Sequence, residues 1–190
     1  MKSLIISLKA FLFFTILTGV VYPLFITGLA QAIFPEKANG SLIKKGNKNI
    51  GSELIGQQFN SEIYFTSRPT AIDYNPLPSG ASNYGLTNIK FRDLVYSRQK
   101  QFIAANKLDN ITKIPSEMLF ASASGLDPHI SPEAALLQVE RIAQARNYNA
   151  YQKQEMKQLI KNQKEAPHFL CLGKGRVNVL LLNFEIDKIK

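Results

Sequence analysis

The chain has 190 residues, which fits one domain of ordinary size plus an appendage. Its 23 lysines and arginines outnumber its 14 aspartates and glutamates, and it has two histidines and one cysteine. One cysteine excludes an internal disulfide, and so few histidines and cysteines argue against a zinc site. The lysines are scattered and no nucleic-acid-binding motif occurs, so the basic charge favours anionic lipid or a partner protein over nucleic acid.

The N-terminal part is apolar. Residues 10–35 contain no charged side chain, and about 20 apolar residues are enough for a helix to cross the hydrocarbon core. We therefore expect a transmembrane helix over residues 10–35, kinked at Pro23, after a short cytoplasmic tail of residues 1–9. The alternative is a signal peptide cleaved after Ala32, because Ala30-Gln31-Ala32 has the small-x-small form. The length of the apolar run favours a retained anchor.

The next segments are polar and irregular. Residues 36–50 contain two glycines and predict a linker, so that residues 51–190 form the domain. Short strands or turns are expected around residues 54–59 and 63–65. Residues 71–88 combine prolines and glycines with asparagines and serines, which predicts a loop without a regular element.

A first helix is predicted from Asn88 to Asn106, with Thr87 as its N-cap. Apolar residues recur on one side at helical spacing, and Arg98 falls inside that stripe. An arginine at such a position is expected to extend to solvent or to pair with a carboxylate or a backbone carbonyl. We therefore predict a structural role for Arg98.

A second helix is predicted after Ser131, which is a good N-cap and is followed by a proline suited to the first helical turn. Leu136 belongs to the predicted core stripe of this helix. Leu137 and Arg141 fall on the opposite side, where an exposed leucine and arginine are typical of a small docking face.

The C-terminal third supplies the remaining elements. Residues 150–164 predict a surface helix with a thin apolar face that includes Tyr151. Residues 176–187 are rich in valine, leucine and isoleucine and predict a buried strand. Helices together with a few strands give a mixed α/β (α+β) domain.

Residues 122–131 raise the question of catalysis, because Ser124, Asp127 and His129 lie close together in the sequence. A membrane-tethered or secreted hydrolase would use these three residues. The glycine that precedes the nucleophile in the usual Gly-x-Ser-x-Gly elbow is missing, however. We favour a structural interpretation, in which Asp127 forms an Asx-type turn and His129 packs or bonds locally.

Six motifs follow one another along the chain: SELIGQQF (52–59), YFTSRPTA (64–71), YNPLPSGASNYGLTN (74–88), SASGLDPHIS (122–131), QVERIAQAR (138–146) and RVNVLLLN (176–183). In this order they resemble the motifs of one family, the C subunit of the Kdp-type potassium-transporting P-type ATPase. Three positions depart from the usual family words: Ala81, Leu86 and Ala123. Ala81 replaces a glycine, which weakens a nucleotide-contacting role for that loop.

The resemblance implies a membrane-anchored subunit whose domain lies outside the cytoplasmic membrane. It implies assembly with a channel-like potassium-translocating subunit, an ATP-hydrolysing P-type subunit and a small single-span subunit. In the family, the C subunit is a non-catalytic accessory subunit, or catalytic chaperone, that raises the apparent ATP affinity of the pump subunit. No tightly bound cofactor or metal is implied. The resemblance implies ATP binding by the complex. Direct contact between ATP and this domain is not expected, because ATP is hydrolysed on the opposite face of the membrane.

The resemblance assigns no catalytic residue to this chain, and its nucleotide-binding residues, if any, are unknown. We expect polar and apolar residues of the family words to shape loops or to contact partner subunits. They are Arg68, Asn83, Asn88, Ser124, Asp127, His129, Leu137, Arg141 and Asn178. A lipid- or wall-binding secreted module stays open as an alternative to the pump subunit, as does the hydrolase.

Overall fold

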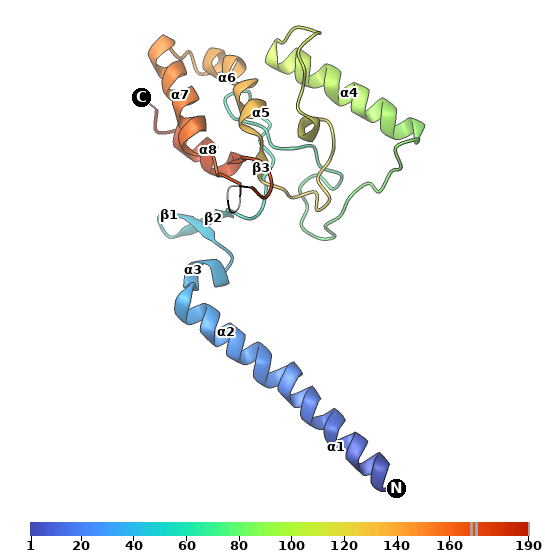
Figure 1. Cartoon of the computed structure of the whole chain (residues 1–190). Coiled ribbons are helices and arrows are strands. Elements are labelled where there is room, and N and C mark those ends of the chain that lie inside the picture. The colour runs from blue at the N-terminus through green and yellow to red at the C-terminus, as the bar shows by residue number, and fades with distance from the viewer. Residues whose placement is uncertain (168, 170, 190) are drawn as a thin grey trace. The chain divides into compact units, whose positions relative to one another are not determined.

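The computed structural model describes residues 1–167, 169 and 171–189, and the chain divides into two units, Met1–Ser52 and Glu53–Lys190 (Figure 1). The first unit contains the apolar helix. The second unit contains a mixture of helices and short strands, in agreement with the predicted α+β class.

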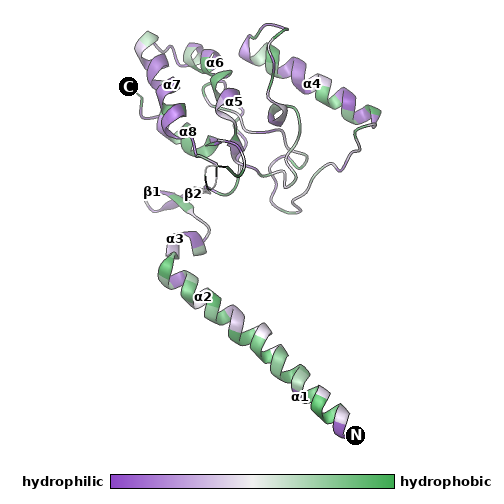
Figure 2. Ribbon diagram, viewed as in Figure 1, coloured by the Kyte–Doolittle hydropathy of each residue, from purple (hydrophilic) through white to green (hydrophobic). Residues whose placement is uncertain are grey.

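The apolar helix runs without interruption over 32 residues, Lys2–Ile33, and contains an 18-residue stretch with a mean hydropathy of 2.3. It consists of α1 (Lys2–Ile16), a π-helical turn η1 (Leu17–Val21) and α2 (Tyr22–Ile33). The wide turn immediately precedes Pro23, which lacks an amide hydrogen and whose ring excludes the carbonyl four residues earlier. Hydrophobic colour covers most of the helix in Figure 2. By length and composition it can span a membrane, as predicted, although it starts before residue 10.

The segment expected to be a linker, residues 36–50, is ordered instead. A short helix α3 (Pro35–Ala38) is followed by an antiparallel hairpin of β1 (Leu42–Lys45) and β2 (Lys48–Ser52). Gly46 adopts φ +61, and the two-residue Gly46-Asn47 turn is one of the pairs that favour tight hairpins. The prediction of a linker from polar composition therefore missed the hairpin turn at residues 46–47.

The second unit contains five helices, two two-residue strands and a 3-10 turn among its described residues. They are α4 (Ile89–Asn106), η2 (Ser116–Met118), β3 (His129–Ile130), α5 (Pro132–Leu136), α6 (Val139–Ala145), α7 (Ala150–Asn162), β4 (Val177–Asn178) and α8 (Val179–Ile186). Strands β3 and β4 pair antiparallel, with His129 opposite Asn178. The surface helix predicted over residues 150–164 is confirmed as α7, but Tyr151 is exposed rather than part of its apolar face.

Two helices, α4 and α8, begin at asparagines that act as N-caps. Asn88, rather than the predicted Thr87, caps α4 by accepting a hydrogen bond from the amide of Phe91. The strand predicted over residues 176–187 is wrong, because only Val177–Asn178 is extended. Asn178 then accepts hydrogen bonds from the amides of Leu180 and Leu181 and starts α8. A short apolar run does not distinguish a strand from a helix, and the N-cap settles the outcome.

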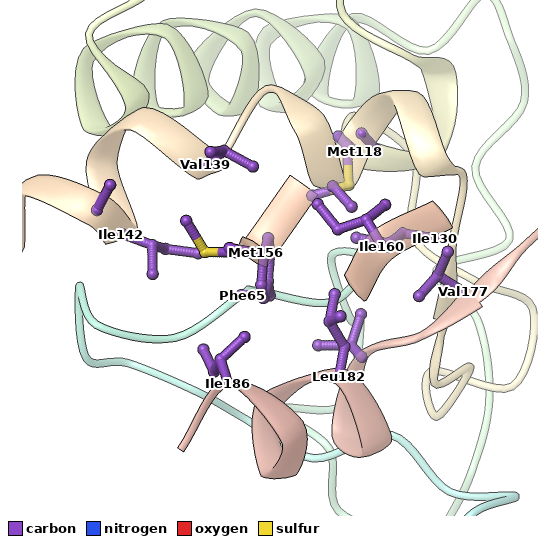
Figure 3. Packing of buried hydrophobic residues seen from close by; sticks show 14 of the residues in the cluster. Phe65, Met118, Ile130, Val139, Ile142, Met156, Ile160, Val177, Leu182 and Ile186 are labelled. Atoms are coloured by element: carbon purple, nitrogen blue, oxygen red, sulfur yellow. The ribbon is translucent and has the colours of Figure 1, made fainter. Parts of the chain in front are cut away.

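The hydrophobic core of the second unit gathers side chains from α5, α6, α7, α8 and both strands around Phe65 (Figure 3). Its largest buried members include Phe65, Ile130, Ile142, Met156, Ile160, Leu182 and Ile186. Leu136, which was predicted to join this core, is 41% exposed, whereas Ala134 and Ala135 are buried. Val139, Ile142 and Ala143, which follow on α6, are buried in the core, although a two-residue turn separates α5 from α6.

Candidate functional site

Residues 122–131 form two consecutive turns held by side chains. The hydroxyl of Ser124 accepts a hydrogen bond from the amide of Leu126 at 3.1 Å. The carboxylate of Asp127 accepts one from the amide of His129 at 3.0 Å. Gly125 has φ +72, and a Cβ there would lie 2.5 Å from Ile72 Cγ1, so only glycine fits this position. The predicted Asx-type turn at Asp127 is confirmed.

A salt bridge connects this turn to the segment before the loop. Arg68 Nη1 lies 2.8 Å from Asp127 Oδ2, and the hydroxyl of Tyr74 donates to the carbonyl of Arg68 at 2.6 Å. Burial by itself raises the pKa of the Asp127 carboxyl, but hydrogen bonds from His129 and Arg68 outweigh that effect and lower the pKa to about 2. Arg68 and Asp127 therefore hold two distant parts of the chain together.

His129 lies between two carboxylates. Its Nδ1 is 3.3 Å from Asp127 Oδ1, and its Nε2 is 3.6 Å from Glu165 Oε1. Glu165 is also bound by Arg176 at 2.8 Å, and their backbones form a β-bridge. The two arginines and two carboxylates fix the imidazole from both sides, and this explains why His129 packs locally.

The arrangement does not assemble a serine triad from these residues. In the part of the chain that the structure describes, no hydrogen bond joins Ser124 to His129, and the exposed Ser124 hydroxyl accepts the Leu126 amide. Among the same residues, no three histidine, cysteine, aspartate or glutamate side chains gather as they would around a metal ion.

Arg141 is buried, so the predicted docking face of Leu137 and Arg141 is wrong. The Arg141 side chain donates to Asn106 Oδ1 at 2.9 Å, Tyr64 O at 3.0 Å and the carbonyl of Glu62. Leu137 is half-buried and packs against the core. The partners that bury Arg141 come from residues 62, 64 and 106, which helical periodicity through residues 132–145 could not reveal.

Two buried amides that sequence reasoning missed complete this set of contacts. Gln138 is fully buried and bonds both the amide and the carbonyl of Thr66, at 2.8 and 3.2 Å. Asn183 likewise bonds the amide and the carbonyl of Phe65, at 2.8 and 2.9 Å. The only signal in the sequence was a polar residue inside each apolar run. The predicted Asn178 has a related role, because its amide donates to the carbonyl of Glu53 at 2.7 Å.

The loop of residues 71–88 has no helix or strand, as predicted, and exposes apolar side chains. Leu77 is 80% exposed and Leu86 90%, and Tyr84 and the adjoining Ile89 are also exposed. Asn83 adopts φ +52, a conformation that asparagine tolerates, and Asn88 ends the loop as the cap of α4. Exposed apolar groups of this size on an ordered loop are typical of a protein contact surface.

The loop is tied to the turn of residues 122–131. The amide of Gly80 donates to the carbonyl of Ser124 at 3.1 Å, and Ile72 packs over Gly125. Of the predicted site residues, Ser124 bonds the loop directly, and Arg68 bonds it through Tyr74 and is held by Asp127. We define the exposed apolar loop by its side chains Leu77, Tyr84, Leu86 and Ile89.

Comparison with known proteins identifies the family. The family model described as K+-transporting ATPase, c chain, matches residues 4–188. A relative from Geotalea uraniireducens is 45% identical over 193 residues, covering 100% of this chain and 99% of its own length. One from Escherichia coli is 42% identical over 192 residues, covering 100% and 99%. One from Caldanaerobacter subterraneus is 41% identical over 185 residues, covering 97% and 94%.

All three relatives carry the name potassium-transporting ATPase KdpC subunit. The matches extend over nearly the whole chain and include the apolar helix, so the resemblance of the six sequence words is confirmed. This chain belongs to the KdpC family, the C subunits of K+-transporting ATPases.

Proposed function

We propose that this chain is a non-catalytic accessory subunit of an ATP-driven potassium uptake complex. Its partners are a channel-like potassium-translocating subunit, an ATP-hydrolysing P-type subunit and a small single-span subunit. The helix Lys2–Ile33 anchors it in the cytoplasmic membrane with the N-terminus inside, and residues 53–190 lie outside. The family match starts at residue 4 and therefore includes the apolar helix, which supports a retained anchor over a cleaved signal peptide.

The exposed apolar loop is the observation that carries this proposal. It is irregular, but it is fastened to the turn of residues 122–131 through Gly80 and Ile72. Leu77 and Leu86 are almost fully exposed at its tip. A fixed backbone reduces the entropy lost on binding, and exposed apolar side chains supply the gain from burial. We assign this loop to the contact with the potassium-translocating subunit.

The effect on ATP affinity is then exerted through the assembled complex. An outer domain that stabilises one conformation of its partner changes the affinity for ATP on the other face by linkage, without touching the nucleotide. We expect the complex that retains this subunit to have a lower KM for ATP than a complex in which the contact is weakened. The purified chain alone is expected to bind no ATP in equilibrium dialysis.

Co-purification tests the docking surface. Leu86→Asp places a charge on the exposed apolar loop and is expected to reduce recovery of the potassium-translocating subunit in mild detergent by at least about tenfold. The matched control is Ile111→Asp, because Ile111 is 94% exposed on a different loop. Equal recovery with the two variants would assign the contact to another surface.

Labelling tests the orientation independently. Cys171 is the only cysteine and is exposed, so a membrane-impermeant maleimide is expected to label it in intact spheroplasts. Lys2→Cys in a Cys171→Ser background is expected to react only after lysis. The opposite pattern would place the domain inside the cell.

A further inference from the structure

A groove of about 500 Å³, lined by both polar and apolar side chains, opens beside the segment of residues 60–70. Helix α4 forms its opposite wall with Arg98, Gln101 and Ala105, and Arg141 lines it from α6. The groove also contains hydroxyl groups, among them Ser61 and Thr70. Neither the membrane anchor nor the exposed apolar loop accounts for this groove.

The arginines of the chain differ in whether they pair with a carboxylate, and this difference distinguishes the two that line the groove. Of the six arginines in the sequence, four pair with a carboxylate. These pairs are Arg68–Asp127 at 2.8 Å, Arg92–Asp93 at 3.4 Å, Arg146–Asp187 at 2.7 Å and Arg176–Glu165 at 2.8 Å. Arg98 and Arg141 have no carboxylate partner among the described residues, and both line the groove.

The charge on these two side chains is compensated only in part. Arg98 is half-buried, and its one hydrogen bond among the described residues goes to the carbonyl of Leu119 at 3.0 Å. Burial lowers the pKa of Arg98, and no neighbouring acid raises it again. Burial also lowers the pKa of Arg141, with a smaller opposing effect from Glu62. Among the described residues that line the groove, Glu62 is the only acidic one, so with Arg98 and Arg141 this lining carries a net charge of about +1.

The remaining hydrogen-bonding capacity favours an acceptor as ligand. The hydroxyl oxygen of Thr70 accepts from the amides of Ile72 and Tyr74, at 3.1 and 3.4 Å, so its proton can be donated outward. The amide of Gln101 adds a further donor at the wall. A guanidinium with open donors in a partly desolvated groove is complementary to a planar or tetrahedral oxyanion.

We propose that this groove is a binding site for a small carboxylate or phosphate anion. Arg98 makes the direct contact through its free donors, and Arg141 supplies positive charge from the base while its own hydrogen bonds stay within the protein. Because the net charge of the lining is small, the ligand is a single oxyanion group rather than a polyanion. The proposal does not depend on the docking function.

Titration of the full-length chain in nonionic detergent tests the site. Isothermal titration calorimetry with inorganic phosphate and with succinate, at constant ionic strength in chloride, is expected to show saturable binding of at least one. Arg98→Gln is expected to weaken it at least about tenfold, because a hydrogen bond to a charged group is lost. Arg92→Gln, at an exposed arginine outside the groove, is the matched control.

A second pair of variants leaves Arg98 in place. Ala105 is exposed on α4 and lines the groove, so Ala105→Glu introduces a competing carboxylate while Ala105→Gln introduces its neutral isostere. Glutamate and glutamine are both good helix formers, so both variants are expected to fold. Binding at least about tenfold weaker in Ala105→Glu than in Ala105→Gln supports the site.

The two probes distinguish the ligand class. Binding of phosphate alone assigns the phosphate class, and binding of succinate alone assigns the carboxylate class. Absence of saturable binding to the native chain for both probes, or equal affinities of the two Ala105 variants, overturns the proposal.

Discussion

Residues 62–66 and the loop of residues 71–88 follow each other closely in the chain, and neither contains a helix or a strand. The carbonyls of residues 62–66 all accept hydrogen bonds from side chains of the helices, namely from Arg141, Arg146, Asn183 and Gln138. The loop, by contrast, bonds within itself, to the neighbouring Arg68 and Thr70, and at Gly80 to the turn of residues 122–131.

The comparison of residues 62–66 with the loop of residues 71–88 shows how a segment without regular secondary structure can be buried in a core. Buried backbone groups need partners, and in residues 62–66 long polar side chains supply the bonds that a neighbouring strand would otherwise provide. Phe65 can therefore be fully buried without belonging to a sheet. Loop 71–88 has fewer such partners, stays at the surface and offers its apolar side chains to another protein.

The largest expected effect comes from removing Arg141, whose side chain bonds two of these five carbonyls. Arg141→Met keeps the volume but leaves the carbonyls of Glu62 and Tyr64 and the Asn106 oxygen without a donor. We expect a loss of about 3–5 kcal/mol in the free energy of unfolding. Urea unfolding followed by circular dichroism measures it. Arg92→Met serves as a control, and an equal loss there would contradict the comparison.

Asn183→Leu is expected to have the next largest effect. The substitution is nearly isosteric but leaves the amide and the carbonyl of Phe65 unpaired inside the core. A loss of about 2–3 kcal/mol in the same unfolding measurement is expected. If the variant were as stable as the native chain, the hydrogen bonds from side chains would not be what stabilises residues 62–66.

The Asp127 salt bridge predicts a pH dependence. The pKa of Asp127 lies near 2, below its ordinary value of 3.8, so its stabilising effect is present above pH 3.8 and is lost as the pH falls toward 2. The expected loss is about 2 kcal/mol. Asp127→Asn should flatten this part of the curve of unfolding free energy against pH. An unchanged slope in that variant would assign the acid sensitivity to other carboxyls.

The smallest effect on stability is expected in the exposed apolar loop. Leu77→Ser removes a side chain that is 80% exposed, so the free energy of unfolding should change by no more than about 0.5 kcal/mol. Leu182→Ser, at a fully buried leucine of α8, is the contrasting variant and should cost about 3 kcal/mol or more. Thermal unfolding of both variants side by side checks this, and a large loss for Leu77→Ser would mean that the loop is part of the core.

The predicted site illustrates which roles are local. The turn at Asp127 and His129 followed from residue chemistry over a few positions and is confirmed. For Arg98 three partners were expected as alternatives, and the structure shows one of them, a backbone carbonyl. The outward orientation of Arg141 was wrong, because residues 62, 64 and 106, far away in the chain, supply its hydrogen-bond partners and cover it. Gln138 bonds the backbone of a residue 72 positions away in the chain, and Asn183 bonds one 118 positions away. No local pattern can predict such pairs.

By itself, the sequence determined the long apolar helix, the surface helix α7, the loop of residues 71–88, the turn after Ser124 and, through its family words, membership of the family. These features depend on hydropathy, capping and turn chemistry within short windows. The helix at residues 179–186, the burial of Arg141 and the groove shared by two arginines that lack a carboxylate partner among the described residues became visible in the three-dimensional structure alone. The reason is that burial and hydrogen-bond partners of these residues are supplied by segments far away in the chain, where local preferences are overridden by packing.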